Sequence, residues 1–159
     1  MSFYNRSFFT FILILIAIFT LQGCDRKRFY EENISIEKSS WNMNDKVKFH
    51  VNITDLQSRY SFYINVRNAD DYKFSNLYLF LHTNLPNGKI TRDTIECQLA
   101  DYDGKWLGSG ITGIKFNRFL FQQGVRFPVS GEYLFTIEQA MRVNDLKGIT
   151  DIGIRMEKD

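Results

Sequence analysis

The chain has 159 residues, with 20 lysines and arginines against 18 aspartates and glutamates, and a net charge of +2. This near balance excludes the clear basic excess that nucleic-acid-binding domains usually carry, so we predict no nucleic-acid partner. Without its first 23 residues, the chain still has a length that suits one domain and buries about two-thirds of its unfolded surface.

The N-terminal segment has the pattern of an export signal. The apolar run from Phe8 to Leu21 is shorter than the roughly 20 apolar residues that cross a bilayer as a helix. Its length is typical of the central part of a secretory signal peptide, and Arg6 supplies the positive charge that precedes such a run. The charged residues 25–28 that follow argue against a buried core strand.

The motif Leu21-Gln22-Gly23-Cys24 resembles a bacterial lipobox. In that chemistry the cysteine thiol receives a diacylglyceryl group, and a peptidase cuts in front of the cysteine, where a small residue such as Gly23 fits. We therefore predict a lipoprotein signal peptide over residues 1–23 and lipidation at Cys24, with enough acyl chains for stable membrane anchoring. The alternatives are an uncleaved anchor, or a buried strand followed by a chance cysteine.

The segment after the signal is predicted to be a tether over residues 24–40, followed by one domain over residues 41–159. Period-two alternation of apolar and polar residues dominates that domain and predicts about eight strands. The Pro86-Asn87-Gly88 and Asp103-Gly104 stretches predict turns, and residues 141–146 predict a turn or a short helix. The clearest strand segments are 47–53, 60–68, 76–83, 89–101, 111–122, 130–139 and 151–158.

These elements predict an all-β fold, an antiparallel two-sheet sandwich of jelly-roll type. The segment 76–83 is apolar on both faces, which favours a central strand covered on both sides. Cys97 alternates with Ile95 and Leu99, which favours a buried small hydrophobe over a free reactive thiol. With Cys24 acylated, Cys97 has no partner for an internal disulfide.

Catalytic and metal-binding patterns are weak. The two histidines lack an HExxH motif, and the serine in "LGSGI" lacks the first glycine of a nucleophile elbow. "DYDG" lacks the later ligands of a calcium loop, and a pair of aspartates stands in an expected loop. We predict no catalytic residue, no metal and no cofactor at these positions: His50, His82, Ser109, Asp101–Gly104 and Asp70–Asp71.

Binding is the stronger functional hypothesis. Tyr63, Tyr78 and Phe80 have the opposite phase to their apolar neighbours, which favours exposure on a sheet face. Trp41 and Trp106 are candidate anchors for a partner or a sugar, or else they close the ends of the core with their indole N–H groups hydrogen-bonded. Arg142 and Arg155, in the charged C-terminal segment, are candidates for a docking surface, because arginine is favoured at interface centres. Mixed charge of this kind also solvates ordinary surfaces.

Several stretches together resemble the GldH family of gliding-motility lipoproteins from Bacteroidota: the lipobox cysteine, "YINVRNADDYKFSNLYLFL", "GKWLGSG", "GEYLFTIEQAMR" and "LKGITDIGIRMEK". The likeness runs from about residue 41 to 158. It implies a membrane-anchored lipoprotein of the cell envelope, at the outer membrane or facing the periplasm, needed for gliding and linked with type IX secretion. The family has no established catalytic residues, so the resemblance assigns none to this chain. Two hypotheses follow: an interaction subunit that contacts other envelope motility or secretion proteins, or a lipid-held glycan-binding module.

Overall fold

A computed structural model describes residues 25–159. The predicted signal peptide over residues 1–23 and the lipidation at Cys24 lie outside the described residues. Between Asp25 and Asp159, no helix has the length and apolar character needed to cross a membrane. The elements in chain order are β1 (Arg28–Ser35), the 3₁₀ turn η1 (Glu37–Ser39), β2 (Ser40–Asn42), β3 (Val47–Ile53), β4 (Tyr60–Ala69), β5 (Asn76–Asn84), β6 (Ile90–Gln98), β7 (Ile114–Val125), β8 (Gly131–Gln139), β9 (Asp145–Lys147) and β10 (Ile149–Lys158).

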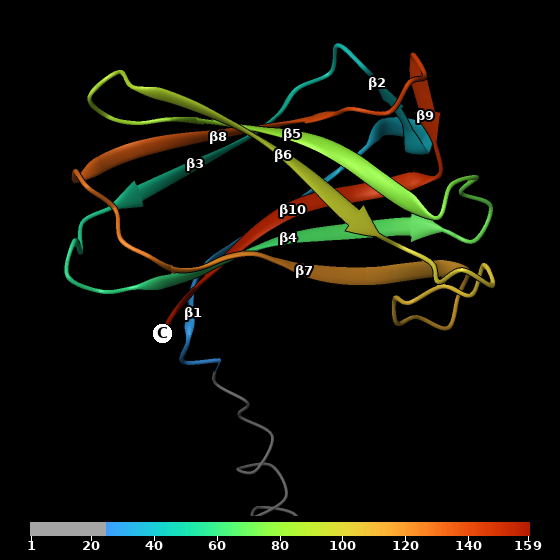
Figure 1. Cartoon of the computed structure of the whole chain (residues 1–159), viewed down its shortest axis with the longest axis horizontal. Coiled ribbons are helices and arrows are strands. Elements are labelled where there is room, and N and C mark those ends of the chain that lie inside the picture. The colour runs from blue at the N-terminus through green and yellow to red at the C-terminus, as the bar shows by residue number, and fades with distance from the viewer. Residues whose placement is uncertain (1–24) are drawn as a thin grey trace, which may run out of the picture.

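The strands form two stacked four-stranded sheets, seen as two layers in Figure 1. Sheet I has the order β1-β10-β4-β7 and sheet II has the order β3-β8-β5-β6, while β2 and β9 form a small separate ladder. All neighbouring strands are antiparallel. When the eight long strands are counted in chain order, sheet I is 1-8-3-6 and sheet II is 2-7-4-5. That is the jelly-roll arrangement, and the predicted all-β sandwich is confirmed.

The core lies between the two sheets, because alternate residues of each strand point inward. β3 shows the pattern most clearly, with every second residue from Val47 to Ile53 buried and Lys48, His50 and Asn52 exposed. Phe62 of sheet I packs against Phe135 of sheet II with ring centroids 5.2 Å apart. Cys97 is fully buried, as predicted, and burial raises the pKa of its thiol to about 12.

The boundary of the predicted tether is wrong. Residues 28–35 form β1, which pairs with β10 along the edge of sheet I. The sequence signal was weak because β1 has another strand on only one side and exposes much of its length, so its apolar alternation is interrupted. The domain therefore includes residues from Arg28 onward, and residues 28–40 are not a free spacer.

One further local expectation is resolved and another needs correction. Residues 141–144 form bends and lead into strand β9, so of the turn or short helix expected over residues 141–146, the bends fit the turn and no helix forms. β5 is central within sheet II, but only its inward face is fully covered, and Tyr78 on its outer face is 38% exposed. The Tyr78 ring on that outer face is therefore available for binding.

Candidate interaction surface

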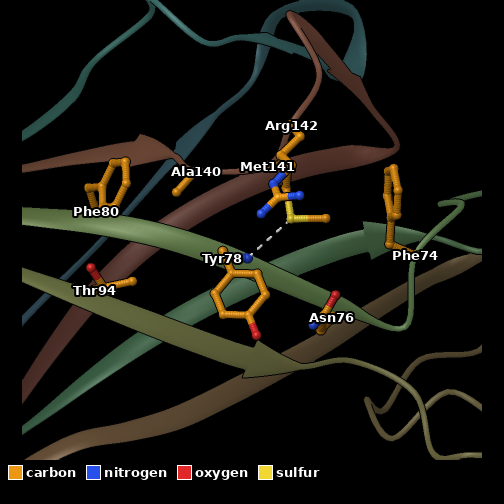
Figure 2. Close-up of a pocket in the computed structure, with 8 residues that line it drawn as sticks. All are labelled: Phe74, Asn76, Tyr78, Phe80, Thr94, Ala140, Met141 and Arg142. Carbon is orange, nitrogen blue, oxygen red and sulfur yellow. Dashed lines mark hydrogen bonds between the residues drawn. The ribbon is translucent and has the colours of Figure 1, made fainter.

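An open hollow of about 490 Å³ lies on the outer face of sheet II, beside the loop that follows β8. Figure 2 shows side chains from β5, from β6 and from two loops gathered around it. The lining is mostly aromatic and apolar, with one cationic side chain at the rim. Its residues are Phe74, Asn76, Tyr78, Phe80, Thr94, Ala140, Met141 and Arg142.

The alternation of β5 supplies the floor of the hollow. Leu77, Leu79 and Leu81 are buried in the core, so the intervening side chains of Tyr78 and Phe80 must project from the outer face. β5 is hydrogen-bonded to an antiparallel strand on each side, to β6 on one and to β8 on the other. The floor is therefore built on a rigid central strand.

The loop after β8 supplies the wall, and Gln139 shapes that loop. The side-chain oxygen of Gln139 accepts a hydrogen bond from the backbone N–H of Met141 at 2.8 Å, and its amide nitrogen donates to the carbonyl of Val143 at 2.8 Å. The backbone N–H of Ala140 donates to the carbonyl of Tyr78 at 2.8 Å. The backbone N–H of Tyr78 lies 3.3 Å from the Met141 sulfur, as the dashed line in Figure 2 marks.

Some side chains around the hollow already form hydrogen bonds or a cation–π contact with their neighbours. Hydrogen bonding to Glu96 raises the pKa of the Tyr78 hydroxyl, and the Asn76 side chain donates to the same carboxylate at 2.7 Å. The guanidinium of Arg92 lies 4.0 Å from the centre of the Phe80 ring and covers one of its faces. Phe74 and Tyr78 are each 38% exposed, so their rings remain the accessible aromatic surfaces.

Of the two predicted docking arginines, only Arg142 is placed to contact a partner. Arg142 is exposed and lies at the rim of the hollow (Figure 2). Arg155 is 5% exposed on the outer face of sheet I, where it pairs with the carboxylates of Asp25, Glu31 and Glu157. The prediction of Arg155 as a docking residue is therefore wrong, because its guanidinium is already enclosed by acidic side chains.

Arg155, Asp25, Glu31 and Glu157 are called the Arg155 cluster below, and their contacts favour the charged forms of Arg155, Glu31 and Asp25. Burial alone disfavours the charged Arg155, but hydrogen bonds to Asp25, Glu157 and Glu31 outweigh it and raise the pKa of Arg155. Burial likewise opposes ionisation of Glu31, yet hydrogen bonds from Arg155 and Asn65 keep the pKa of Glu31 below its usual value. The hydrogen bond from Arg155 lowers the pKa of Asp25 as well.

The two tryptophans belong to the packing of the domain. Trp41 is fully buried, and its indole N–H donates to the carbonyl of Asp45 at 2.8 Å, so its assignment to an interaction surface is wrong. Trp106 is half-buried and packs against the core, with its ring 6.4 Å from that of Tyr72. Neither tryptophan lines the hollow.

Sequence reasoning missed Phe74 and Met141, although it singled out Tyr78 and Phe80. Phe74 lies in the loop before β5, and Met141 lies just beyond the end of β8. No strand alternation reaches either position, so no periodic signal could have marked them. The third aromatic candidate, Tyr63, lies on the outer face of sheet I, opposite Arg155.

None of the weak catalytic candidates lines the hollow. His50 contacts Glu132 in a pair whose side chains are 62% and 65% exposed. His82 lies 3.5 Å from Glu138, which also pairs with Lys46 at 2.8 Å. The backbone of Ser109 pairs with that of Phe116 in an isolated bridge, a context that does not form a nucleophile elbow.

Metal binding has no geometric support within residues 25–159, where no group of three histidine, cysteine, aspartate or glutamate side chains could hold an ion. Asp101 accepts from the backbone N–H groups of Asp103 and Lys105, at 3.0 and 2.9 Å, and so closes the turn that begins "DYDG". Asp70 pairs with Lys115 at 3.4 Å.

The sequence model of the GldH lipoprotein family matches residues 28–156, from the start of β1 almost to the end of β10. The chain belongs to the GldH lipoprotein family. It is 37% identical over 160 residues to a "Gliding motility lipoprotein GldH homolog" of Christiangramia forsetii, covering 96% of this chain and 98% of that protein. It is 35% identical over 153 residues to "Gliding motility lipoprotein GldH" of Flavobacterium johnsoniae, covering 92% and 94% of the two chains.

Solved structures resemble this GldH family member only distantly. A GH115 4-O-methyl-α-glucuronidase matches with a TM-score of 0.43 and 8% identity, over 84% of this chain and 18% of that one. A family 28 carbohydrate-binding module matches with a TM-score of 0.41 and 10% identity, over 80% and 71% of the two chains. Likeness at this level carries no functional argument.

Proposed function

We propose that this chain is a lipid-anchored, non-catalytic interaction subunit of the envelope apparatus for gliding motility, which is linked with type IX secretion. The observation that carries the proposal is the hollow on sheet II, where the exposed ring of Tyr78 on the central strand β5 lies beside Phe74 and Arg142 of the adjoining loops. The names of the two relatives support the motility assignment, since each match covers more than nine-tenths of this chain.

The anchor in this proposal is the acylated Cys24, which holds the domain on a membrane of the cell envelope, at the outer membrane or facing the periplasm. The family description as a lipoprotein supports it. A Cys24→Ser variant should remain an unprocessed precursor that a palmitate analogue does not label. Processing and labelling of that variant would contradict the lipobox interpretation.

A protein partner suits the chemistry of the hollow. Tyr, Phe, Met and Arg are enriched at the centres of protein interfaces, and rigid aromatic rings contribute large contact area at low cost in side-chain entropy. Phe74, Tyr78, Met141 and Arg142 bring these side chains together at one place. Arg142 at the rim favours a partner with an acidic group beside an apolar one.

Glycan binding is the second candidate, because sugar rings stack on exposed aromatic side chains. Phe74 and Tyr78 offer accessible rings, and Asn76 and Thr94 offer polar groups next to them. The third ring is less suitable, since Arg92 covers a face of Phe80. The accessible aromatic surface therefore falls short of a row of three free rings, and we favour the protein partner.

The test is site-specific photo-crosslinking in cells that lack the native copy. A photoreactive amino acid at Phe74 should capture one defined envelope protein, identified by mass spectrometry, and the same probe at Lys48 should not. Lys48 is the matched control because it is exposed on the same sheet face, on β3, away from the hollow. Tyr78→Ala and Arg142→Ala should each weaken that cross-link and reduce colony spreading.

The alternatives give different results in the same cells. Binding of the purified protein to envelope polysaccharide that Tyr78→Ala abolishes, with no protein cross-link at Phe74, would replace the first candidate by the second. His50→Ala, His82→Ala and Ser109→Ala should have mild effects. If any of these three changes abolished colony spreading while the fold and the complex stayed intact, a non-catalytic role would be contradicted.

A further inference from the structure

The first residue that the structure describes is fixed to the outer face of sheet I. The carboxylate of Asp25 pairs with Arg155, whose side chain is only 6% exposed. The backbone N–H of Arg28 donates to the carbonyl of Asp25 at 3.3 Å, which closes a turn in front of β1. Within that turn, the carbonyl of Lys27 accepts a hydrogen bond from the backbone N–H of Lys158 at 2.9 Å, so the turn itself is held against the end of β10.

This arrangement leaves almost no free chain between the domain and the predicted anchor. Cys24 is bonded directly to Asp25, and neighbouring Cα atoms are about 3.8 Å apart. A lipid on Cys24 would therefore enter the bilayer close to the point where Asp25 meets Arg155. A domain on a long spacer could rotate freely above the membrane, whereas a domain held this closely presents one preferred side.

The outer face of sheet I has side chains that suit a membrane surface. One row across its four strands, in register, is Glu31, Arg155, Tyr63 and Leu120. Leu120 is 51% exposed, and the neighbouring Phe116 ring lies beneath the guanidinium groups of Arg67 and Arg118, at 5.8 and 5.5 Å. Aromatic and basic side chains together favour the boundary between lipid headgroups and acyl chains.

The charges on this face are arranged so that the cations are the more accessible partners. Arg28 is 55% exposed and Arg118 is 32% exposed, whereas their common partner Glu31 is 16% exposed. Arg67 is 45% exposed against 16% for its partner Asp151. Arg26 and Lys27, in the turn next to the anchor, are exposed as well. Anionic lipid headgroups attract such a surface, although Asp25 remains 42% exposed.

We infer that the outer face of sheet I, from the Arg155 cluster to Leu120, rests on the bilayer that holds the lipid of Cys24. The inference depends on the proposed acylation of Cys24. It has a structural consequence for the hollow with Tyr78 and Arg142, which lies on the outer face of the opposite sheet. That hollow then faces away from the membrane, where an envelope partner can reach it.

The test uses the full chain, acylated in cells, purified in detergent and placed in vesicles of phosphatidylethanolamine and phosphatidylglycerol with a nitroxide on part of the headgroups. One fluorophore is attached to Leu120→Cys on sheet I, or to Lys48→Cys on sheet II as the matched control. The introduced thiol is the reactive one, because acylation occupies Cys24 and Cys97 is buried. Quenching by the headgroup nitroxide should be several-fold stronger at position 120 than at position 48.

The outcomes separate the orientation from the anchoring. Equal quenching, or stronger quenching at position 48, in protein whose acylation is verified by mass spectrometry would overturn the orientation alone. Absence of lipid on Cys24 would overturn both proposals. A flexible insertion of 20 Gly and Ser residues between Cys24 and Asp25, which spans about 25 Å on average, leaves the Arg155 cluster intact. It should reduce the difference between the two positions, and an unchanged difference would overturn the role given to the short connection.

Discussion

Replacement of Arg155 by methionine should destabilise the domain through the charges that it leaves behind. Methionine retains most of the apolar volume of the arginine stem, so the change removes mainly the guanidinium. Glu31 and Glu157 then lose their hydrogen-bonded cation while their side chains are only 16% and 20% exposed. Asp25 loses the contact that holds it against sheet I.

The size of the effect follows from the burial of these groups. Removing one partner of a fully buried ion pair costs about 3–5 kcal/mol, because the remaining charge lacks compensation. Here Glu31 keeps a second cation, Arg118, at 2.8 Å, and both glutamates retain some contact with water. We therefore expect Arg155→Met to lower the free energy of unfolding by about 2–3 kcal/mol at pH 7, which is less than the loss for a fully buried ion pair.

The assay is urea unfolding of residues 24–159, followed by circular dichroism, at pH 7 and again near pH 3. The folded-state pKa values of Asp25 and Glu31 are depressed, so their stabilising contribution is present above their ordinary pKa near 4 and is lost as the pH falls through the folded-state values. The difference between wild type and Arg155→Met should therefore shrink in acid.

Arg142→Ala is the matched control for this experiment, because Arg142 is exposed. It should change the free energy of unfolding by less than about 0.5 kcal/mol. A loss below about 1 kcal/mol for Arg155→Met at pH 7 would refute the assigned role of the cluster. A loss of equal size at both pH values would assign the effect to packing of the arginine stem.

Two substitutions and one labelling experiment test the packing of the domain. Phe135→Ala removes a ring that is 3% exposed and should cost about 3–5 kcal/mol in urea unfolding, whereas a loss below about 1 kcal/mol would mean that the strand faces the other way. Gly153→Ala would put a Cβ 2.5 Å from the backbone carbonyl oxygen of Glu32, so it should lower the free energy of unfolding by about 1–3 kcal/mol. Unchanged stability would disprove this close approach of β1 and β10. In residues 25–159, which lack Cys24, Cys97 with its pKa raised to about 12 should react with a maleimide at pH 8 only after unfolding, and prompt labelling of the folded protein would contradict its burial.

The sequence by itself determined the elements whose signal is local. Period-two alternation predicted β3 with the bounds that the structure has, and it predicted β4, β8 and β10 to within a few residues. The turn at Pro86-Asn87-Gly88 forms as expected, with Gly88 at φ +82° and the N–H of Leu85 donating to the carbonyl of Lys89 at 2.8 Å. Such patterns can be read from one segment because strand faces and turn geometry depend on residues close together in the chain.

The tertiary structure alone decided which predicted surface residues are accessible. Arg142 and Arg155 occupy the same charged C-terminal segment, and no local pattern distinguishes them. Arg155 is enclosed because β1 brings Glu31 and Asp25 to it from 124 and 130 residues away, whereas Arg142 lies on an exposed bend beside β5. Burial of a polar side chain depends on which distant strand becomes its neighbour, and that neighbour is set by the pairing of whole sheets.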